Sequence, residues 1–296
     1  MKMGMSKYFK TKRARKETIL GFVFLLPSFL GVSIFVLIPF IDAVRRSFSE
    51  TMTRRFVGLE NYRLVFANEA FKLAAKNTGK FLLICIPLLL LLSLFFSVLL
   101  FSIGRLQNVI KTTFLIPMVI PAASIVLLWR VFFDEYGMLN KIIVHFGGSG
   151  TDWMNSSKAF YILVFTYIWK NIGYDIILWL AGLNGISQSV YEAASVDGAG
   201  TFTKFIYITI PNLMSTLFIV TVLSLINSFK VFREAYLIAG DYPHESIYML
   251  QHVFNNWFTN LDIQKMCAGA VLVAITLLTV IIGIQKLTGS DKEEVL

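Results

Sequence analysis

Long stretches without a charged side chain recur along this sequence, separated by shorter polar segments. The uncharged runs are residues 18–41, 81–103, 112–129, 205–229 and 266–285. Each is long enough for an α-helix, rising about 1.5 Å per residue, to cross a hydrocarbon core of about 30 Å. Because lipid cannot satisfy the backbone groups of an open sheet, we expect these runs to be helices.

A sixth run, residues 159–183, has the required length but carries Lys170 and Asp175. We therefore predict an all-α integral membrane protein with six transmembrane helices. The composition agrees, because 56% of the 296 residues are hydrophobic and only 15% are charged, which is unusual for a soluble domain.

The polar positions of the sixth run are the first candidates for binding chemistry. Asn171 and Asp175 are four residues apart and share one helix face, with Tyr174 next to them. Intramembrane carboxylates are costly and usually face the protein interior or a water-filled cavity. One interpretation is that this face, together with Asn227 in a later run, lines a path for a polar solute. The other is that these residues serve helix packing or lie near a membrane interface.

The net charge of +9 is explained largely by a basic segment directly before the first apolar run. Lys and Arg next to a first membrane helix predict a cytoplasmic N-terminus, and six crossings then place the C-terminus and residues 184–204 there too. Residues 42–80, which would lie outside, also carry eight Lys and Arg, and this weakens the expected excess of positive charge on the cytoplasmic side. No segment is large enough to form a folded basic surface, so we expect no nucleic-acid binding.

Two prolines interrupt the run at residues 112–129. Pro117 and Pro121 are four residues apart, and each removes a backbone hydrogen bond. We expect a bend or an unwound turn here, which is either a flexible point or a static kink. Catalytic motifs, by contrast, are missing: the sequence has no phosphate-binding loop, no His-Glu-x-x-His and no Gly-x-Ser-x-Gly. We expect no enzymatic activity, no metal and no cofactor.

The segment at residues 184–204 is charged, short and broken by glycine. It contains Tyr191-Glu192-Ala193-Ala194-Ser195-Val196-Asp197-Gly198-Ala199, and Ile208-Thr209-Ile210-Pro211 follows. We expect Ser189 to cap a short helix with Glu192 in its first turn, and Gly198 to permit the turn that follows. Pro211 is expected to bend the next helix. The segment is either a docking surface for another protein or an ordinary polar turn.

The spacing of Glu-Ala-Ala, Gly and Ile-x-Leu-Pro, with Ile210 in place of the leucine, resembles the coupling loop of bacterial ABC-importer permeases. Other matching segments are Gly58-Leu59-Glu60-Asn61-Tyr62, Asn77-Thr78, residues 115–121, Trp129-Arg130, Gly137, Asn140, Asp152-Trp153 and Ala181-Gly182-Leu183. Across nearly the whole chain, the protein resembles the maltose and glycerol-phosphate type of permease.

The resemblance implies half of a translocation pore for a carbohydrate, with an oligosaccharide as the expected substrate, in the bacterial inner or plasma membrane. Its partners would be a second permease subunit, a cytoplasmic ATPase dimer that binds the ATP, and an extracytoplasmic solute-binding protein. The ATPase-docking residues would be Glu192, Ala193, Ala194, Asp197 and Gly198. The domains implied are a tail at 1–17, a transmembrane domain at 18–286 and a tail at 287–296, with an external loop at 42–80.

Other solutes remain open at this point, namely glycerol phosphate, a polyamine or a peptide. A membrane-embedded enzyme is a further alternative, but it predicts a cluster of acidic or metal-binding residues that we do not find. Two external segments, residues 239–243 and 261–266, depart from the patterns common in related permeases. The substrate of a relative therefore cannot be transferred to this chain.

Overall fold

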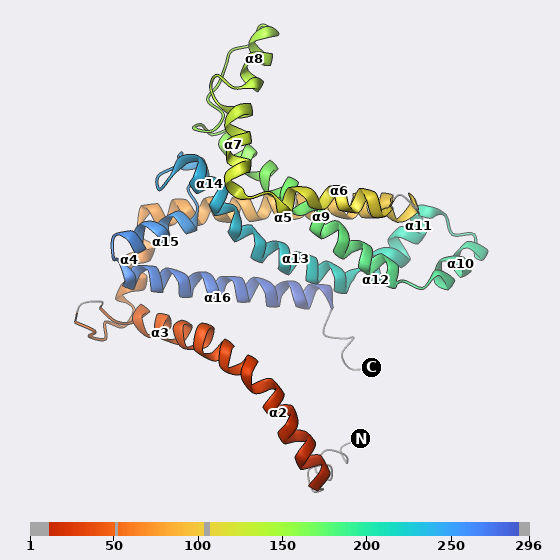
Figure 1. Ribbon diagram of the computed structural model, residues 1–296, viewed down its shortest axis with the longest axis horizontal. Helices are drawn as coiled ribbons and strands as arrows, with labels where there is room; N and C mark the ends of the chain where they lie inside the picture. The colour runs from red at the N-terminus through yellow and green to blue at the C-terminus, as the bar shows by residue number, and fades with distance from the viewer. Residues whose placement is uncertain (1–11, 51–52, 104–106, 290–296) are drawn as a thin grey trace. The chain divides into compact units, whose positions relative to one another are not determined.

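The computed structural model describes residues 12–50, 53–103 and 107–289, and these residues are almost entirely helical (Figure 1). Their β pairing is limited to an isolated bridge between Ser49 and Phe56, which confirms the all-α prediction. The chain divides into two compact units, Met1–Val65 with Asp262–Leu272 and Phe66–Leu261 with Val273–Leu296. Most of the predicted tails, residues 1–11 and 290–296, lie outside the described residues.

The first unit begins with a long apolar helix. It consists of α2 (Lys12–Val32), a π-helical turn η1 (Ser33–Leu37) and α3 (Ile38–Ser47). Large side chains along it are exposed, such as Phe24 at 78% and Phe35 at 80%. An apolar surface of this extent requires lipid or another protein to cover it.

The Gly-Leu-Glu-Asn-Tyr segment shapes the turn after α3. Gly58 has a φ of 58°, and α4 (Glu60–Ala67) follows. The buried Asn61 side chain donates hydrogen bonds to the carbonyl oxygens of Ser47 and Ser49, each at 3.0 Å. Tyr62 adds a hydroxyl contact with Ser47 at 2.7 Å. The motif thus closes a turn that would otherwise leave carbonyl groups unpaired.

Helix α9 (Ala159–Gly185) is the centre of the second unit, where it packs against α5 (Glu69–Ile103), α6 (Gln107–Val119) and α13 (Met214–Ser228). Its Tyr167 and Trp179 side chains are each 2% exposed and lie in the main hydrophobic core. Gly173 lets α6 approach closely, because an added Cβ would collide with the carbonyl group of Phe114. Helix α9 is surrounded by protein rather than lipid over much of its length, which allows its polar residues.

Short elements connect and extend these long helices. They are α7 (Ala122–Phe133), α8 (Met138–His145), α10 (Gln188–Val196), α11 (Thr201–Lys204), η3 (Phe205–Thr209), α12 (Ile210–Asn212), η4 (Phe229–Val231), α14 (Phe232–Ala239), η5 (Glu245–Ile247) and α15 (Leu250–Thr259). The final helix is α16 (Ile263–Thr288). In the second unit, α10 and α11 lie at one end and α14 and α15 at the other.

Four described helices are long and apolar enough to cross a membrane, judged by length and composition: Lys16–Ser47, Glu69–Ile103, Met214–Leu237 and Ile263–Thr288. A fifth candidate is the pair Val109–Val119 and Ala122–His145, bent by 90° at the break between them. Helix α9 does not qualify because its polar and charged residues lower its hydropathy. The prediction of six spans is therefore met in part.

Candidate functional site

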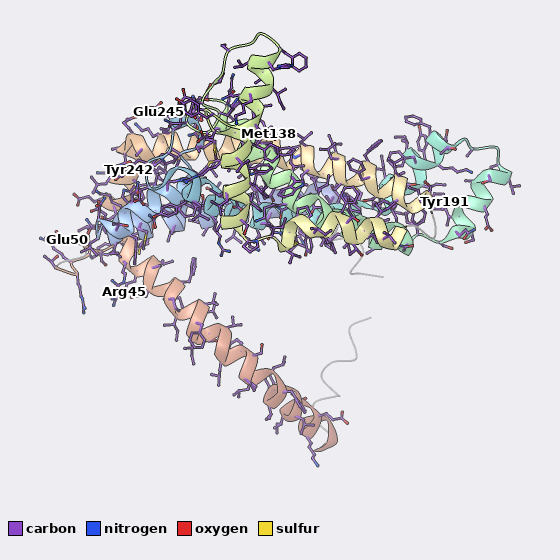
Figure 2. The ribbon with its side chains drawn as sticks, turned by 45° about the horizontal axis from the view of Figure 1, so that its top comes forward. Arg45, Glu50, Met138, Tyr191, Tyr242 and Glu245 are labelled. Carbon is purple, nitrogen blue, oxygen red and sulfur yellow. The ribbon has the colours of Figure 1, made fainter. Side chains whose placement is uncertain are left out.

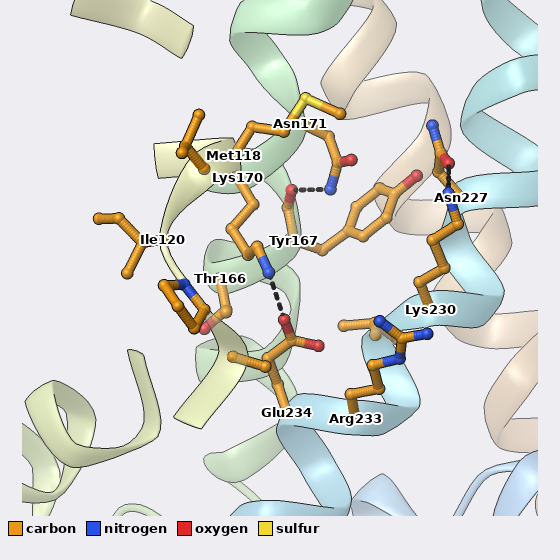
Figure 3. Close-up of a pocket in the computed structure, with 14 residues that line it drawn as sticks. Met118, Ile120, Thr166, Tyr167, Lys170, Asn171, Asn227, Lys230, Arg233 and Glu234 are labelled. Carbon is orange, nitrogen blue, oxygen red and sulfur yellow. Dashed lines mark hydrogen bonds and ion pairs between the residues drawn. The ribbon is translucent and has the colours of Figure 1, made fainter. Parts of the chain in front are cut away.

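A cavity of about 290 Å³ opens in the second unit between the α6–α7 break, α9 and the α13–α14 region (Figure 3). Its wall combines apolar groups from the broken helix with charged and amide side chains from the other helices. The residues that line it are Met118, Val119, Ile120, Pro121, Ala122, Thr166, Tyr167, Lys170, Asn171, Asn227, Lys230, Val231, Arg233 and Glu234.

The break at Pro121 forms one wall of this cavity, whereas Pro117 lies within α6 and outside the lining. Helix α6 ends at Val119, and Pro121, with φ −57° and ψ 142°, precedes the first residue of α7. Proline lacks an N–H and disfavours a helical conformation in the residue before it, which favours the end of the helix at this point. The predicted bend is confirmed, because the two helices meet at 90° across this break, and Ile120, Pro121 and Ala122 at the break line the cavity.

A buried ion pair crosses the cavity floor from α9 to α14. The Lys170 ammonium lies 2.6 Å from Glu234 Oε1, and the two side chains are 19% and 4% exposed. A charge this buried needs a partner, so each group stabilises the other in place. Glu234 was not among the path residues predicted from the sequence. The available signal was a lone carboxylate in the helical stretch after residue 229, which could have been matched to Lys170.

Two of the predicted path residues meet at the cavity. Asn171 on α9 and Asn227 on α13 both line it. The Asn171 amide donates to the Tyr167 carbonyl oxygen at 2.8 Å, and Asn227 Oδ1 accepts from the Lys230 ammonium at 2.7 Å. Both amides keep further donor or acceptor capacity for a polar solute.

The other two predicted path residues lie outside the cavity lining. Asp175 is 1% exposed and accepts a hydrogen bond from the Ser224 hydroxyl at 2.8 Å, where α9 packs on α13. Trp179 on the same face donates to Ser93 of α5 at 3.0 Å. Tyr174 is half-buried on α9. For Asp175 and Tyr174, a role in the path stays a prediction, whereas the hydrogen bonds of Asp175 and Trp179 serve helix packing.

The glycine-broken loop forms a separate candidate surface around α10. The helix begins two residues earlier than expected, with Ser187 as the N-cap residue, so Ser189 lies inside it and does not cap it. Glu192 falls beyond the first turn and accepts a hydrogen bond from Gln188 at 3.0 Å. The expectation about the turn is met, because Gly198 has a φ of 81°.

The remaining contacts of this loop fix its shape while leaving its surface open. The Tyr191 hydroxyl, labelled in Figure 2, lies 2.8 Å from Thr209 Oγ1, and Lys204 donates to the Ser195 hydroxyl at 2.5 Å. These bonds connect α10 to the helix that follows. The residues of α10 and α11 include none that is buried, and Val196 and Phe202 are 89% and 78% exposed. The predicted docking residues share this surface, with Ala194 half-buried and the others exposed.

Pro211 also acts as expected on the helix after the loop. A π-helical turn at η3 and the three-residue α12 precede a break at Leu213, where α13 begins. Gly182 of α9 lies against this break, since an added Cβ would come within 2.9 Å of Leu213 Cδ2. The loop is therefore joined to α13, one of the helices that form the cavity wall, through irregular helical turns.

A buried histidine packs at the other end of the second unit, away from α10 and α11. His252 on α15 is fully buried, accepts a hydrogen bond from the Met249 N–H at 3.1 Å, and packs edge-on to Phe232 of α14 at 4.8 Å between ring centroids. Its Nε2 atom has no hydrogen-bond partner among the described residues. Burial disfavours the charged imidazolium and lowers the pKa of His252 to about 4.

The Asn77-Thr78 segment anchors the same region. The Asn77 amide donates to the carbonyl oxygens of Glu245 and Tyr248 at 2.6 and 3.0 Å, and Thr78 Oγ1 accepts from the Leu250 N–H at 3.1 Å. These bonds join α5 to the start of α15. No group of three or more metal-ligating side chains occurs among the residues described by the structure.

Residues 90–288 match the family described as "Binding-protein-dependent transport system inner membrane component". The trehalose/maltose transport system permease protein MalF of Thermococcus litoralis is 28% identical over 93% of this chain and 95% of its own length. The sulfoquinovosyl glycerol transport system permease protein SmoG of Agrobacterium fabrum is 30% identical over 87% of this chain and 86% of its own.

A solved structure agrees on the fold. The crystal structure of a bacterial alginate ABC transporter in complex with an alginate pentasaccharide-bound periplasmic protein contains a chain with a TM-score of 0.77 and 21% identity. The match covers 92% of this chain and 95% of that one. The protein described here belongs to the family of inner-membrane components of binding-protein-dependent transport systems. The family resemblance noted in the sequence is thereby confirmed.

Proposed function

We propose that this chain is one of two permease subunits in an ABC importer for a carbohydrate. The observation that carries the proposal is the combination of a polar cavity inside an apolar helical unit with an exposed, glycine-broken loop at the end of the same unit. Membership in the family supports the importer class, and relatives named for trehalose/maltose and sulfoquinovosyl glycerol support the substrate class.

The proposed translocation path runs along the cavity. Asn171 and Asn227 would offer amide groups to sugar hydroxyls, and the ring of Tyr167 lies in the same wall. Because the cavity wall comes from one chain, a second permease subunit would close the path from its open side. Helix α9 would count as a membrane span, since its polar residues face protein and cavity, and the bent α6–α7 pair would complete six.

The proposed ATPase-docking surface is α10 with the turn at Gly198. Glu192, Ala193, Asp197 and Gly198 are exposed there, so a partner can approach the helix closely. Nucleotide-driven movement of the partner would reach the cavity through η3, α12 and α13. In this proposal α10 and both termini would lie in the cytoplasm, and the partner subunit would bind and hydrolyse the ATP. A solute-binding protein would deliver the sugar on the opposite side.

The test is uptake of labelled oligosaccharides by cells that express the chain with its partner permease, ATPase and binding protein. We expect Glu192→Lys and Gly198→Asp to reduce uptake at least tenfold while the amount of transporter in the membrane stays unchanged. Gly200→Asp is the matched control, because Gly200 has an ordinary φ of −71° and open space around it. Full uptake by both variants would refute the docking role, and entry of a polyamine or peptide in place of any sugar would refute the substrate class.

A further inference from the structure

The cavity carries an excess of positive charge. Lys170, Lys230, Arg233 and Glu234 are its charged lining residues, which leaves two cationic groups uncompensated. Lys170 and Glu234 neutralise each other in their buried pair at 2.6 Å. The excess therefore resides on Lys230 and Arg233, which follow each other within one helical turn at the junction of α13 and α14 (Figure 3).

Neither cation is neutralised by the protein around it. Lys230 donates to the Asn227 amide oxygen at 2.7 Å, and an ammonium group has two further donors. In the part of the chain that the structure describes, no carboxylate lies within ion-pair distance of Lys230 or Arg233. A guanidinium group presents a planar set of donors that matches carboxylate, phosphate or sulfonate oxygens.

The backbone adds to the same field. Helix α7 starts at Ala122, and both Ala122 and the preceding Pro121 line the cavity. The unpaired N–H groups of a helix start carry partial positive charge. Lys230 and Arg233 are both exposed on the open side of the cavity, so water weakens their field, but the two cations still attract anions and repel cations there.

We propose that the cavity admits an anionic carbohydrate, whose carboxylate, phosphate or sulfonate group pairs with Arg233 and Lys230. The sugar hydroxyls would hydrogen-bond to Asn171 and to the free Glu234 oxygen. This inference rests on the proposed function, in which the cavity belongs to the translocation path, and it narrows the substrate class. It also disfavours polyamines, which carry the same sign of charge as the cavity.

The experiment compares two labelled trisaccharides of equal size in cells that contain the complete transporter. One trisaccharide is neutral, and the other has a uronic acid at one end. We expect the unmodified transporter to import the acidic trisaccharide at least tenfold faster. Lys230→Gln and Arg233→Gln should each reduce uptake of the acidic trisaccharide about tenfold more than uptake of the neutral one. Lys141→Gln is the control, an exposed cation on α8 that lies outside the cavity lining.

The possible outcomes separate this inference from the proposed function. Faster import of the neutral trisaccharide would overturn the inference and leave the proposed carbohydrate importer intact. Equal losses for both trisaccharides in the glutamine variants would also overturn it, as expected if the two cations contact lipid phosphate groups instead. Import of neither trisaccharide, nor of any other carbohydrate, would refute the proposed function itself.

Discussion

In the second unit, the cavity region and the loop around α10 differ in how far their charged residues are buried. At the cavity, Lys170 and Glu234 form an ion pair whose side chains are only 19% and 4% exposed, although the neighbouring Lys230 and Arg233 are exposed. Around α10, Glu192 and Asp197 are exposed, and even Val196 is 89% exposed. A buried pair contributes to the folded state of the chain itself, whereas an exposed helix with apolar side chains gains stabilisation only when a partner covers it. Variants at the cavity should therefore reduce the stability of the chain, whereas variants at α10 should reduce uptake with little loss of stability.

The largest effect is expected from Gly173→Ala on α9. The added methyl group would collide with the backbone carbonyl of Phe114, which cannot move away as a flexible side chain could. Overpacking against backbone should cost more than about 3 kcal/mol, above the usual range for such changes. Thermal unfolding of the purified transporter measures it. Gly185→Ala on the same helix, with open space around it, should change stability by less than about 0.5 kcal/mol.

Glu234→Ala should come next, because it leaves the Lys170 ammonium largely buried without its partner. We expect a loss of about 3 kcal/mol in stability together with a loss of uptake. The double variant Lys170→Met/Glu234→Leu removes both charges and should recover most of the stability. If uptake also recovers in the double variant, the ion pair serves only the structure, and the proposed contact between Glu234 and the solute does not occur.

Acidification should produce an intermediate effect through His252. An unfolded histidine has a pKa of about 6.5, and burial lowers the pKa of His252 to about 4, so the unfolded chain takes up the proton first. Stability should therefore fall as the pH drops below 6.5, by about 2 kcal/mol between pH 7 and 5, and level off below pH 4. His252→Asn keeps an acceptor for the Met249 N–H and should remove this part of the slope. An unchanged slope would exclude His252 as its source.

The smallest effect is expected at the loop, from Gly198→Ala. Alanine at a φ of 81° costs about 1 kcal/mol although nothing lies within 4 Å of the added Cβ. If the strained turn weakens docking of the ATPase, uptake should fall about fivefold. The unfolding temperature of the purified transporter should change little. Gly200→Ala, at an ordinary φ of −71°, should leave uptake unchanged. A fall in stability without a fall in uptake would contradict the expectation that the loop around α10 serves docking and not the stability of the chain.

The sequence alone predicted much of this protein because membrane crossing and chain reversal depend on local properties. Uncharged runs of sufficient length imply helices wherever lipid surrounds the backbone. Proline at 121 and glycine at 198 impose a break and a turn through their own backbone chemistry. The spacing of Glu192, Gly198 and Pro211 carried the family resemblance, and the family match confirmed it.

Other features were decided only by the tertiary structure, because they depend on residues far apart in the chain. Glu234 becomes part of the cavity because α14 places it 2.6 Å from Lys170, which is 64 residues away in the sequence. Asn171 and Asp175 share a helix face, yet one meets the cavity and the other meets Ser224 of α13. Helical periodicity determines which residues share a face, but the neighbouring helices determine whether that face meets water or protein.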